Sequence, residues 1–412
     1  MLTPPLSEDD FAALMAPLGP FGPAPRLSVG VSGGPHSLAL TLLAQAWARR
    51  RGGDVLALVA DHGLRAGSAA EAAHVARLLA VQGVTVQVLR LGLSAGPSMQ
   101  ERARGARLSA LSVAAAEAGR PWLLLGHHRG DQAETVLFRA LRGSLAMGLA
   151  AMALVRDGGA ALILRPLLGV PPAALEAVLA AAGIAPVRDP SNDDPRFARV
   201  RLRRALADPD GTGAGVAALA EAAAAFALRR GRAGAALAER LALAAEIRPE
   251  GFAWLDPAAL GRDALAVSAL GRLVALVGGT RYLPAPARVV ALLEARGGTL
   301  AGAWLRPASR GRWLLARDPG AVAGPVPAIA GTIWDGRFRV LGSEAMGCTV
   351  GPAGEAATRL RERLNLPAAV MRALPVIRRP DGALVEVPSC SLVFSPVLNL
   401  GAIGERSDES PG

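Results

Sequence analysis

A glycine-rich turn at residues 29–37 reads VGVSGGPHS and joins a β-branched apolar run to a helical run. Its two adjacent glycines let the backbone approach a ligand closely. The helix expected from Leu38 to about Arg50 would present free N–H groups and the positive end of its dipole to that ligand. Ser32 and Ser37 add hydroxyl donors, so the turn can bind an anion such as phosphate. A plain strand-to-helix turn, as in any α/β protein, is the alternative that stays open.

Two common phosphate-binding motifs do not explain this turn. A Walker A loop ends in G-K-[ST], and the chain contains no lysine, so all 45 of its Lys+Arg residues are arginine. The dinucleotide fingerprint G-x-G-x-x-G is also absent from the turn.

Strand and helix signals alternate on both sides of the turn. Runs of continuous apolar residues predict buried strands at 27–31, 55–60, 84–91, 122–125 and 162–164. Amphipathic runs predict helices at 68–81, 98–118 and 131–142. The pattern predicts a parallel sheet covered by helices, with its ligand beyond the carboxyl ends of the strands. The loops expected at that edge are 32–37, 61–65 and 126–131.

The remainder of the chain changes character after a basic stretch at 196–204. We expect an alanine-rich helix over 215–245, a mixed region to about residue 316, a Pro/Gly-rich linker over 318–327 and short strands at 332–340, 383–387 and 392–394. The predicted fold class is therefore α/β, with a Rossmann-like parallel-sheet domain followed by a helical domain and a small α+β domain. The predicted boundaries are 1–207, 208–318 and 331–405.

Composition favours a polyanionic partner. The formal net charge is +11 over 412 residues. A GC-rich genome explains the use of arginine over lysine, but not the excess of positive over negative charge, which suits nucleic acid. No run of about 18 apolar, uncharged residues predicts a membrane span, and the N-terminus lacks signal-peptide features. These features predict a cytoplasmic protein without a membrane partner. Cys348 and Cys390 form no C-x-x-C, which argues against a zinc or iron–sulfur site.

The turn is similar to S-G-G-x-D-S, the PP-loop of the N-type ATP pyrophosphatases. Further segments between about residues 25 and 205 resemble, in the same order, those of the tRNA(Ile)-lysidine synthase family. The matching segments are Asp61-His62-Gly63-Leu64-Arg65 (D-H-x-L-R); Ala103, Arg104 and Arg107 (A-R-x-x-R); Gly126 to Thr135 (G-H-H-x-D-D-Q-x-E-T); Arg142-Gly143 with Gly148-Leu149 and Met152 (R-G-x-G-x-x-G-L-x-x-M); Arg165 to Leu168; Asp189-Pro190-Ser191-Asn192; and Arg199 with Arg203 (R-N-x-x-R).

The resemblance implies a two-step reaction on tRNA. ATP would activate the C2 carbonyl of the wobble cytidine in an isoleucine tRNA with a CAU anticodon, and the ε-amine of free lysine would displace AMP. It implies ATP and Mg²⁺ as cofactors and tRNA and lysine as partners, with a homodimer left open. The residues that it assigns to ATP are Ser32, Gly33, Gly34, Pro35, His36 and Ser37. Those that it assigns to catalysis are Asp61, His62, Arg65, Asp131 and Glu134. Those that it assigns to the substrates are Arg104, Arg107, His128, Arg142, Asp189, Asn192, Arg199 and Arg203.

The same residues have structural interpretations that stay open. Asp131 and Glu134 are three apart and share a helix face, where they can receive an ammonium group, but acids also stabilise a helix N-terminus. His127 and His128 can be ordinary strand-end histidines, because adjacent side chains on a strand point apart and form a poor zinc pair. Residues 189–192 can form a turn that caps a helix, and the arginines of 199–204 a solvated face.

Two departures from the family pattern affect the expected metal site. His36 stands where the PP-loop has an acid, and Gly130 replaces the first acid of the D-D pair. Imidazole is a poor ligand for Mg²⁺, which prefers hard oxygen, and glycine offers no side chain. The metal ligands are therefore not assigned. Leu145, Met147 and Ala151 also differ from the family's glycine-rich segment.

Two hypotheses follow. The first is an active ligase whose metal is held by other oxygens, such as those of Asp61, Asp131, ATP and water. The second is a relative that binds nucleotide or tRNA without turnover. We prefer the first, because the segment 189–204 largely matches. A thiolating PP-loop ligase is a weaker alternative, since such enzymes usually need a cysteine pair near the site.

Overall fold

The computed structural model describes residues 3–61, 67–91, 99–144, 146–187, 196, 198–342, 347–361, 364–386 and 392–395, without the side chains of 99–104, 359, 361 and 386. These residues form two compact units, one ending at Arg230 and the other beginning at Gly231. The boundary falls within the long helix α9 (Ala214–Ala244), close to the 215–245 expected. The three-domain boundaries remain a prediction.

The first unit is built on a six-stranded sheet in the order β3-β2-β1-β4-β6-β5. Five of its strands are parallel, and only the edge strand β5 is antiparallel to its neighbour. The strands are β1 (Arg26–Val31), β2 (Asp54–Asp61), β3 (Thr85–Arg90), β4 (Trp122–Leu125), β5 (Val155–Asp157) and β6 (Leu162–Leu164). The predicted parallel sheet is confirmed. Strand β5 was not predicted, because its three residues are all exposed and carry no apolar pattern.

Eight α-helices of the described residues precede α9. They are α1 (Glu8–Met15), α2 (Pro35–Arg49), α3 (Ser68–Val81), α4 (Met99–Glu117), α5 (Arg129–Leu141), α6 (Ala146–Leu149), α7 (Pro172–Ala181) and α8 (Ala198–Leu206). Helix α2 begins three residues before the expected Leu38, because the fixed φ of Pro35 suits the first helical position.

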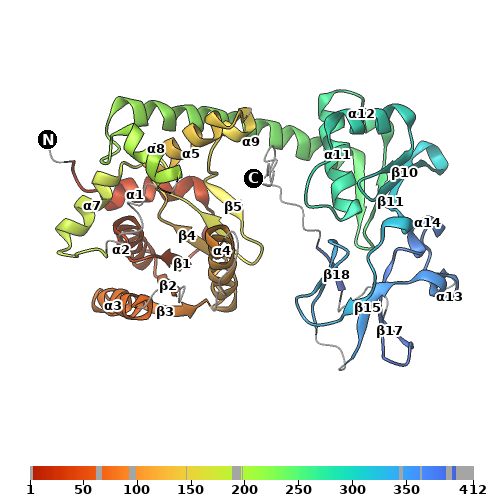
Figure 1. The fold of residues 1–412 in the computed structure, drawn as a ribbon, viewed down its shortest axis with the longest axis horizontal. Coiled ribbons are helices and arrows are strands. Elements are labelled where there is room, and N and C mark those ends of the chain that lie inside the picture. The colour runs from red at the N-terminus through yellow and green to blue at the C-terminus, as the bar shows by residue number, and fades with distance from the viewer. Residues whose placement is uncertain are drawn as a thin grey trace. The chain divides into compact units, whose positions relative to one another are not determined.

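Helices cover both faces of this sheet (Figure 1). One apolar core joins α1, α2, α3 and α7 to the sheet through buried residues such as Leu27 and Leu40. A second core packs Leu111 of α4 against Leu123 and Ile163 from the other face. Both faces of the central strands are thus buried, which explains why they read as continuous apolar runs.

The second unit begins with helices over an antiparallel sheet of five strands, in the order β7-β8-β11-β10-β9. The strands are β7 (Ala245–Arg248), β8 (Phe252–Leu255), β9 (Gly298–Leu300), β10 (Ala303–Pro307) and β11 (Trp313–Arg317); the helices are α10 (Pro257–Leu260), α11 (Ala264–Gly278) and α12 (Pro286–Ala295). This sheet lies in the stretch expected to be mixed, and α11 packs on it through residues such as Leu270 and Leu273.

The C-terminal part of this unit has two small antiparallel sheets, β12-β15-β16-β17 and β13-β14-β18. The elements are β12 (Val326–Pro327), β13 (Ile333–Trp334), β14 (Phe338–Val340), β15 (Thr349–Pro352), α13 (Ala357–Arg361), α14 (Ala368–Met371), β16 (Pro375–Arg378), β17 (Leu384–Glu386) and β18 (Leu392–Phe394). The expected strand at 332–340 is a hairpin, because Asp335 and Gly336 both have positive φ and form its turn. No helix of the described residues is long and apolar enough to cross a membrane.

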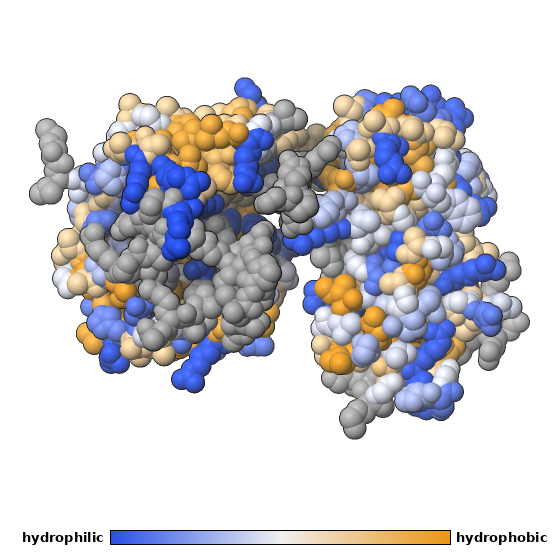
Figure 2. Space-filling model, viewed as in Figure 1, coloured by the Kyte–Doolittle hydropathy of each residue, from blue (hydrophilic) through white to orange (hydrophobic). Residues whose placement is uncertain are grey.

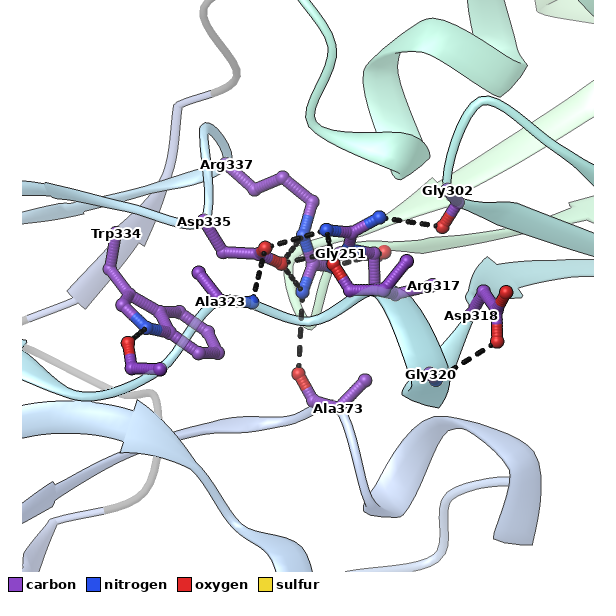
Figure 3. Close-up of polar contacts among 12 residues, drawn as sticks. Gly251, Gly302, Arg317, Asp318, Gly320, Ala323, Trp334, Asp335, Arg337 and Ala373 are labelled. Carbon is purple, nitrogen blue, oxygen red and sulfur yellow. Dashed lines mark hydrogen bonds and ion pairs between the residues drawn. The ribbon is translucent and has the colours of Figure 1, made fainter.

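A buried ion cluster fixes this hairpin turn (Figure 3). The carboxylate of Asp335 lies between two guanidinium groups and accepts hydrogen bonds from Arg317 at 2.7 and 2.9 Å and from Arg337 at 2.8 Å. The side chains of Asp335 and Arg337 are each only 1% exposed. Burial by itself raises the pKa of Asp335, but these hydrogen bonds and charges outweigh it and hold the pKa below its ordinary value.

Replacing Asp335 by asparagine is expected to lower the free energy of unfolding by about 3–5 kcal/mol, because two buried cations lose their counter-charge. Since the folded pKa is depressed, the stabilisation is complete above the ordinary pKa of 3.8 and is lost as pH falls through the folded value. Urea unfolding at pH 7 and at lower pH measures both effects. The exposed Asp381, whose carboxylate caps a turn, is the control, and an equal loss in Asp381→Asn would contradict the prediction.

Candidate active site

The predicted PP-loop is a closed turn between β1 and α2. The hydroxyl of Ser37 accepts a hydrogen bond from the backbone N–H of Ser32 at 3.2 Å and donates one to the carbonyl of Gly34 at 3.0 Å. Gly33 has a φ of +81°, and a Cβ there would lie 2.8 Å from Cγ2 of Val75. The turn therefore needs glycine at position 33 for both conformation and space.

Helix α2 starts at this turn without a side-chain cap from the described residues, with Gly34 at the N-cap position. By contrast, Ser7 caps α1 and His128 caps α5. The first-turn N–H groups of α2 are thus left for a ligand or water, as in an anion site.

The loop after β4 lies directly against the PP-loop. Strand β1 is between β2 and β4, with Gly30 opposite Leu58 and Leu125. A Cβ on Gly126 would lie 3.0 Å from the carbonyl carbon and oxygen of His36 and from Cα of Ser37. The sheet order reverses between β1 and β4, and ligands of such sheets bind at that point. At the end of β2, Asp61 is buried.

Three polar side chains meet where the two loops touch. The rings of His36 and His128 are edge-to-face, with centroids 4.0 Å apart. The Oδ2 atom of Asp131 accepts a hydrogen bond from the backbone N–H of His128 at 3.0 Å and lies 3.4 Å from its Nε2. Asp131 thereby caps its own helix, as the structural interpretation expected, and also faces the histidine pair.

The charges of these groups follow from their surroundings. Burial, aided by His128, lowers the pKa of His36 to about 3, so its imidazole is neutral at pH 7. Burial raises the pKa of Asp131, but the three neighbouring histidines and the N–H of His128 outweigh it and leave the pKa below its ordinary value. Asp131 is therefore an anion at neutral pH.

A second buried acid follows one turn later. Oε1 of Glu134 accepts a hydrogen bond from Nε of Arg203 at 2.6 Å, whereas Oε2 is buried and has no hydrogen-bond partner among the described residues. Burial raises the pKa of Glu134 despite the nearby positive charges of Arg203 and Arg199. The pair connects α5 to α8, so the basic stretch predicted to bind phosphate lies beside the predicted catalytic helix.

The segment after α6 is fastened to α5 by a glutamine that the sequence analysis did not single out. Gln132 donates to the carbonyl of Met152 at 3.1 Å and accepts from its N–H at 2.9 Å. Ala151 has a φ of +45°, where alanine stands in place of the family's glycine. Arg139 and Arg230 both donate to the carbonyl of Ala151, at 3.1 and 3.4 Å. Gln132 is part of the quoted motif, but Arg230 belongs to no motif and could not be found from sequence.

The structure brings together most of the predicted site that it describes. The PP-loop residues, His128, Asp131, Glu134, Arg199 and Arg203 lie in or beside the touching loops. Arg107 of α4 is partly buried, which lowers its pKa, and Arg142 stacks on Phe138 with 4.5 Å between its guanidinium carbon and the ring centre. Outside the described residues lie His62, Arg65, Asp189 and Asn192, and the side chain of Arg104. No group of three or more His, Cys, Asp or Glu side chains among the described residues is placed to hold a metal.

The closed glycine turn, the uncapped helix behind it and the adjoining β4 loop are the features of a PP-loop domain, and a family model described as a PP-loop domain matches residues 6–209. A tRNA(Ile)-lysidine synthase from Novosphingobium aromaticivorans is 43% identical over 305 residues, which cover 72% of this chain and 90% of that protein. A tRNA(Ile)-lysidine synthase from Mesorhizobium japonicum is 36% identical over 363 residues, covering 83% of this chain and 79% of that protein. The chain belongs to the tRNA(Ile)-lysidine synthase family.

Among solved structures, a U34-tRNA thiolase from Methanococcus maripaludis is similar with a TM-score of 0.43 and 14% identity, covering 55% of this chain and 78% of that one. At that TM-score the likeness is too slight to bear on the assignment.

Proposed function

We propose that this chain is an ATP-dependent ligase that converts the wobble cytidine of isoleucine tRNA with a CAU anticodon to lysidine. In the first step the C2 oxygen of the cytidine attacks the α-phosphate of ATP, and pyrophosphate leaves. In the second step the ε-nitrogen of free lysine bonds to C2, and AMP leaves with that oxygen. The observation that carries the proposal is the direct contact between the PP-loop and the loop of His128 and Asp131, in a chain of this family.

The residues present fit ATP. Gly33 and Gly34 keep the turn free of side chains, and a Cβ on Gly34 would meet only the Ser32 hydroxyl, at 3.6 Å. The uncapped start of α2 offers its N–H groups to phosphate oxygens. The hydroxyls of Ser32 and Ser37 line the same turn and are 3.3 Å apart. We therefore assign residues 32–37 to the phosphates.

The donor set fits Mg²⁺ in part. The anionic carboxylate of Asp131 at the start of α5 is a hard oxygen donor, as is the carboxylate of the buried Asp61 at the end of β2. We assign the metal to these two residues, whereas the imidazole of His36 is unsuited. When bound, Mg²⁺ would offset the negative charge of the phosphates. Asp131 and the buried acid Glu134 share one face of α5 and are suited to receive the ammonium of lysine.

The basic helix α8 supports RNA binding. It carries arginines at positions 199, 201, 203 and 204, and Figure 2 shows hydrophilic side chains gathered over this part of the first unit. Arg203 joins this helix to Glu134. We propose that α8 holds tRNA phosphates close to the reacting base. A homodimer and a cytoplasmic location remain predictions.

Replacing Arg203 by methionine is expected to raise the pKa of Glu134 further, because the carboxylate loses its hydrogen bond and its nearest cation. If Glu134 must be anionic to receive lysine, the acid limb of the pH profile of kcat/KM for lysine moves to higher pH by about one unit. Steady-state rates between pH 5 and 9 measure this. Arg203 contributes most to lowering the pKa of Glu134, so Arg204→Met, at an exposed neighbouring position, should leave the limb in place. An unmoved limb in Arg203→Met would contradict the role given to Glu134.

The function is tested by incubating the purified chain with ATP, Mg²⁺, lysine and an isoleucine tRNA transcript, and then analysing its nucleosides by mass spectrometry. We expect lysidine in place of the wobble cytidine, and none when lysine is omitted or when the wobble base is uridine. Binding of tRNA and ATP without any lysidine would favour the relative without turnover. If the double variant His36→Asp with Gly130→Asp then made lysidine, the two departures would be the cause of the inactivity of the natural chain.

A further inference from the structure

The two departures from the family's acids lie against one side chain, that of His128. The ring of His36 meets it from α2, with centroids 4.0 Å apart and planes inclined by 67°. From α5, a Cβ on Gly130 would lie 3.1 Å from its Cε1 atom and 3.2 Å from Nδ1. Positions 36 and 130 are far apart in sequence, yet both lie against the same imidazole ring.

His128 is held from several directions. Its Nδ1 accepts a hydrogen bond from the N–H of Gly130 at 3.1 Å, so the neutral ring carries its proton on Nε2. That nitrogen lies 3.4 Å from Oδ2 of Asp131. His36 closes the remaining side, and its own Nε2 is buried without a hydrogen-bond partner among the described residues. The contact of His36 with His128 is therefore a packing contact.

This arrangement of the His128 ring depends on the absence of a side chain at position 130. A contact of 3.1 Å is tighter than nine in ten real Cβ contacts, so a side chain at 130 would push the His128 ring away by a few tenths of an ångström. A shift of this size would lengthen the hydrogen bond from the N–H of Gly130 to Nδ1 and press the ring toward His36. Helix propensity favours alanine over glycine at a position inside α5, so any loss caused by alanine there comes from this contact.

We propose that His36, His128 and Gly130 act as one unit, in which His36 is a positioning residue that holds the His128 imidazole beside Asp131. In this unit, a ring that positions its neighbour stands in place of a carboxylate that would bind metal. Its catalytic consequence rests on the proposed function, because Asp131 is assigned there to the metal and to lysine.

A double-mutant cycle in the full chain tests the unit. We expect Gly130→Ala to lower kcat for lysidine formation about tenfold, with KM for ATP unchanged, but to lower it less than about twofold when His36 is already alanine. Gly231, where a Cβ meets nothing within 4 Å, supplies the control Gly231→Ala. Effects of Gly130→Ala that are equal in both backgrounds would overturn the coupling.

The ring itself is tested by two single variants. His36→Phe keeps a ring that cannot bind metal, whereas His36→Asp restores the acid and removes the ring, so kcat should be higher in His36→Phe than in His36→Asp while Gly130 is retained. The opposite order, with aspartate active and phenylalanine inactive, would overturn the positioning role.

Urea unfolding of the same variants separates this proposal from the proposed function. Gly130→Ala should lower the urea midpoint in the wild-type background and not when His36 is alanine, whether or not lysidine is made. If the wild type makes no lysidine but the midpoints show this coupling, only the proposed function fails. If lysidine is made and the midpoints and rates are both additive, only the unit fails.

Discussion

Asp131→Asn is expected to lower kcat/KM for lysidine formation by about 10²–10⁴-fold, the size of effect that follows from losing a charged group at the reacting atoms. The asparagine oxygen can still accept the hydrogen bond from the N–H of His128, so the start of α5 should persist. What is lost is the negative charge, which Asp131 carries at neutral pH because its pKa lies below its ordinary value.

The control for this variant is Asp9→Asn, which removes a carboxylate that is 95% exposed in the same unit. Rates at varied ATP and lysine concentrations separate binding from turnover, and circular dichroism checks the fold. A rate for Asp131→Asn within about threefold of the wild type, with an intact fold, would remove Asp131 from the catalytic assignment.

Gly126→Ala is expected to lower kcat/KM by up to about 10²-fold, which is the effect of a misplacement of about 1 Å between reacting groups. The added Cβ would lie 3.0 Å from backbone atoms of His36 and Ser37, and backbone cannot yield as the end of a flexible side chain can. The β4 loop and the PP-loop must therefore move apart, which separates the ATP phosphates from Asp131.

Gly105→Ala is the matched control, since a Cβ at Gly105 meets nothing within 4 Å. Measurement of ATP affinity and of kcat for both variants gives the result. If Gly126→Ala retained full activity, the close approach of the two loops would not be needed for the reaction.

Much of the first unit could be predicted from sequence because its central strands are buried on both faces. The apolar runs around Val29, Leu58 and Leu124 left little choice of secondary structure, and parallel strands place their following loops at one edge. Helix α3 was predicted at its observed bounds. The exposed strand β5 was missed, and the hairpin at Asp335 was expected as one strand.

The candidate site was predictable as a set of loops but not as a set of contacts. Sequence indicated that His36 departs from the family pattern, yet its packing on His128 depends on how α2 and the β4 loop meet. The pairing of Glu134 with Arg203 joins residues 69 apart in sequence, and no local pattern fixes that distance. The ion cluster around Asp335 likewise depends on tertiary packing, because Arg317 comes from another sheet.

We propose that the PP-loop holds ATP for cleavage between its α- and β-phosphates, next to the bound tRNA. The most direct measurement follows ATP labelled at the α-phosphate, with isoleucine tRNA and lysine present or absent. The expected result is labelled AMP, with pyrophosphate in equal amount, only when tRNA and lysine are both present over many turnovers. Labelled ADP with free phosphate, or AMP formed at the same rate without tRNA, would contradict it.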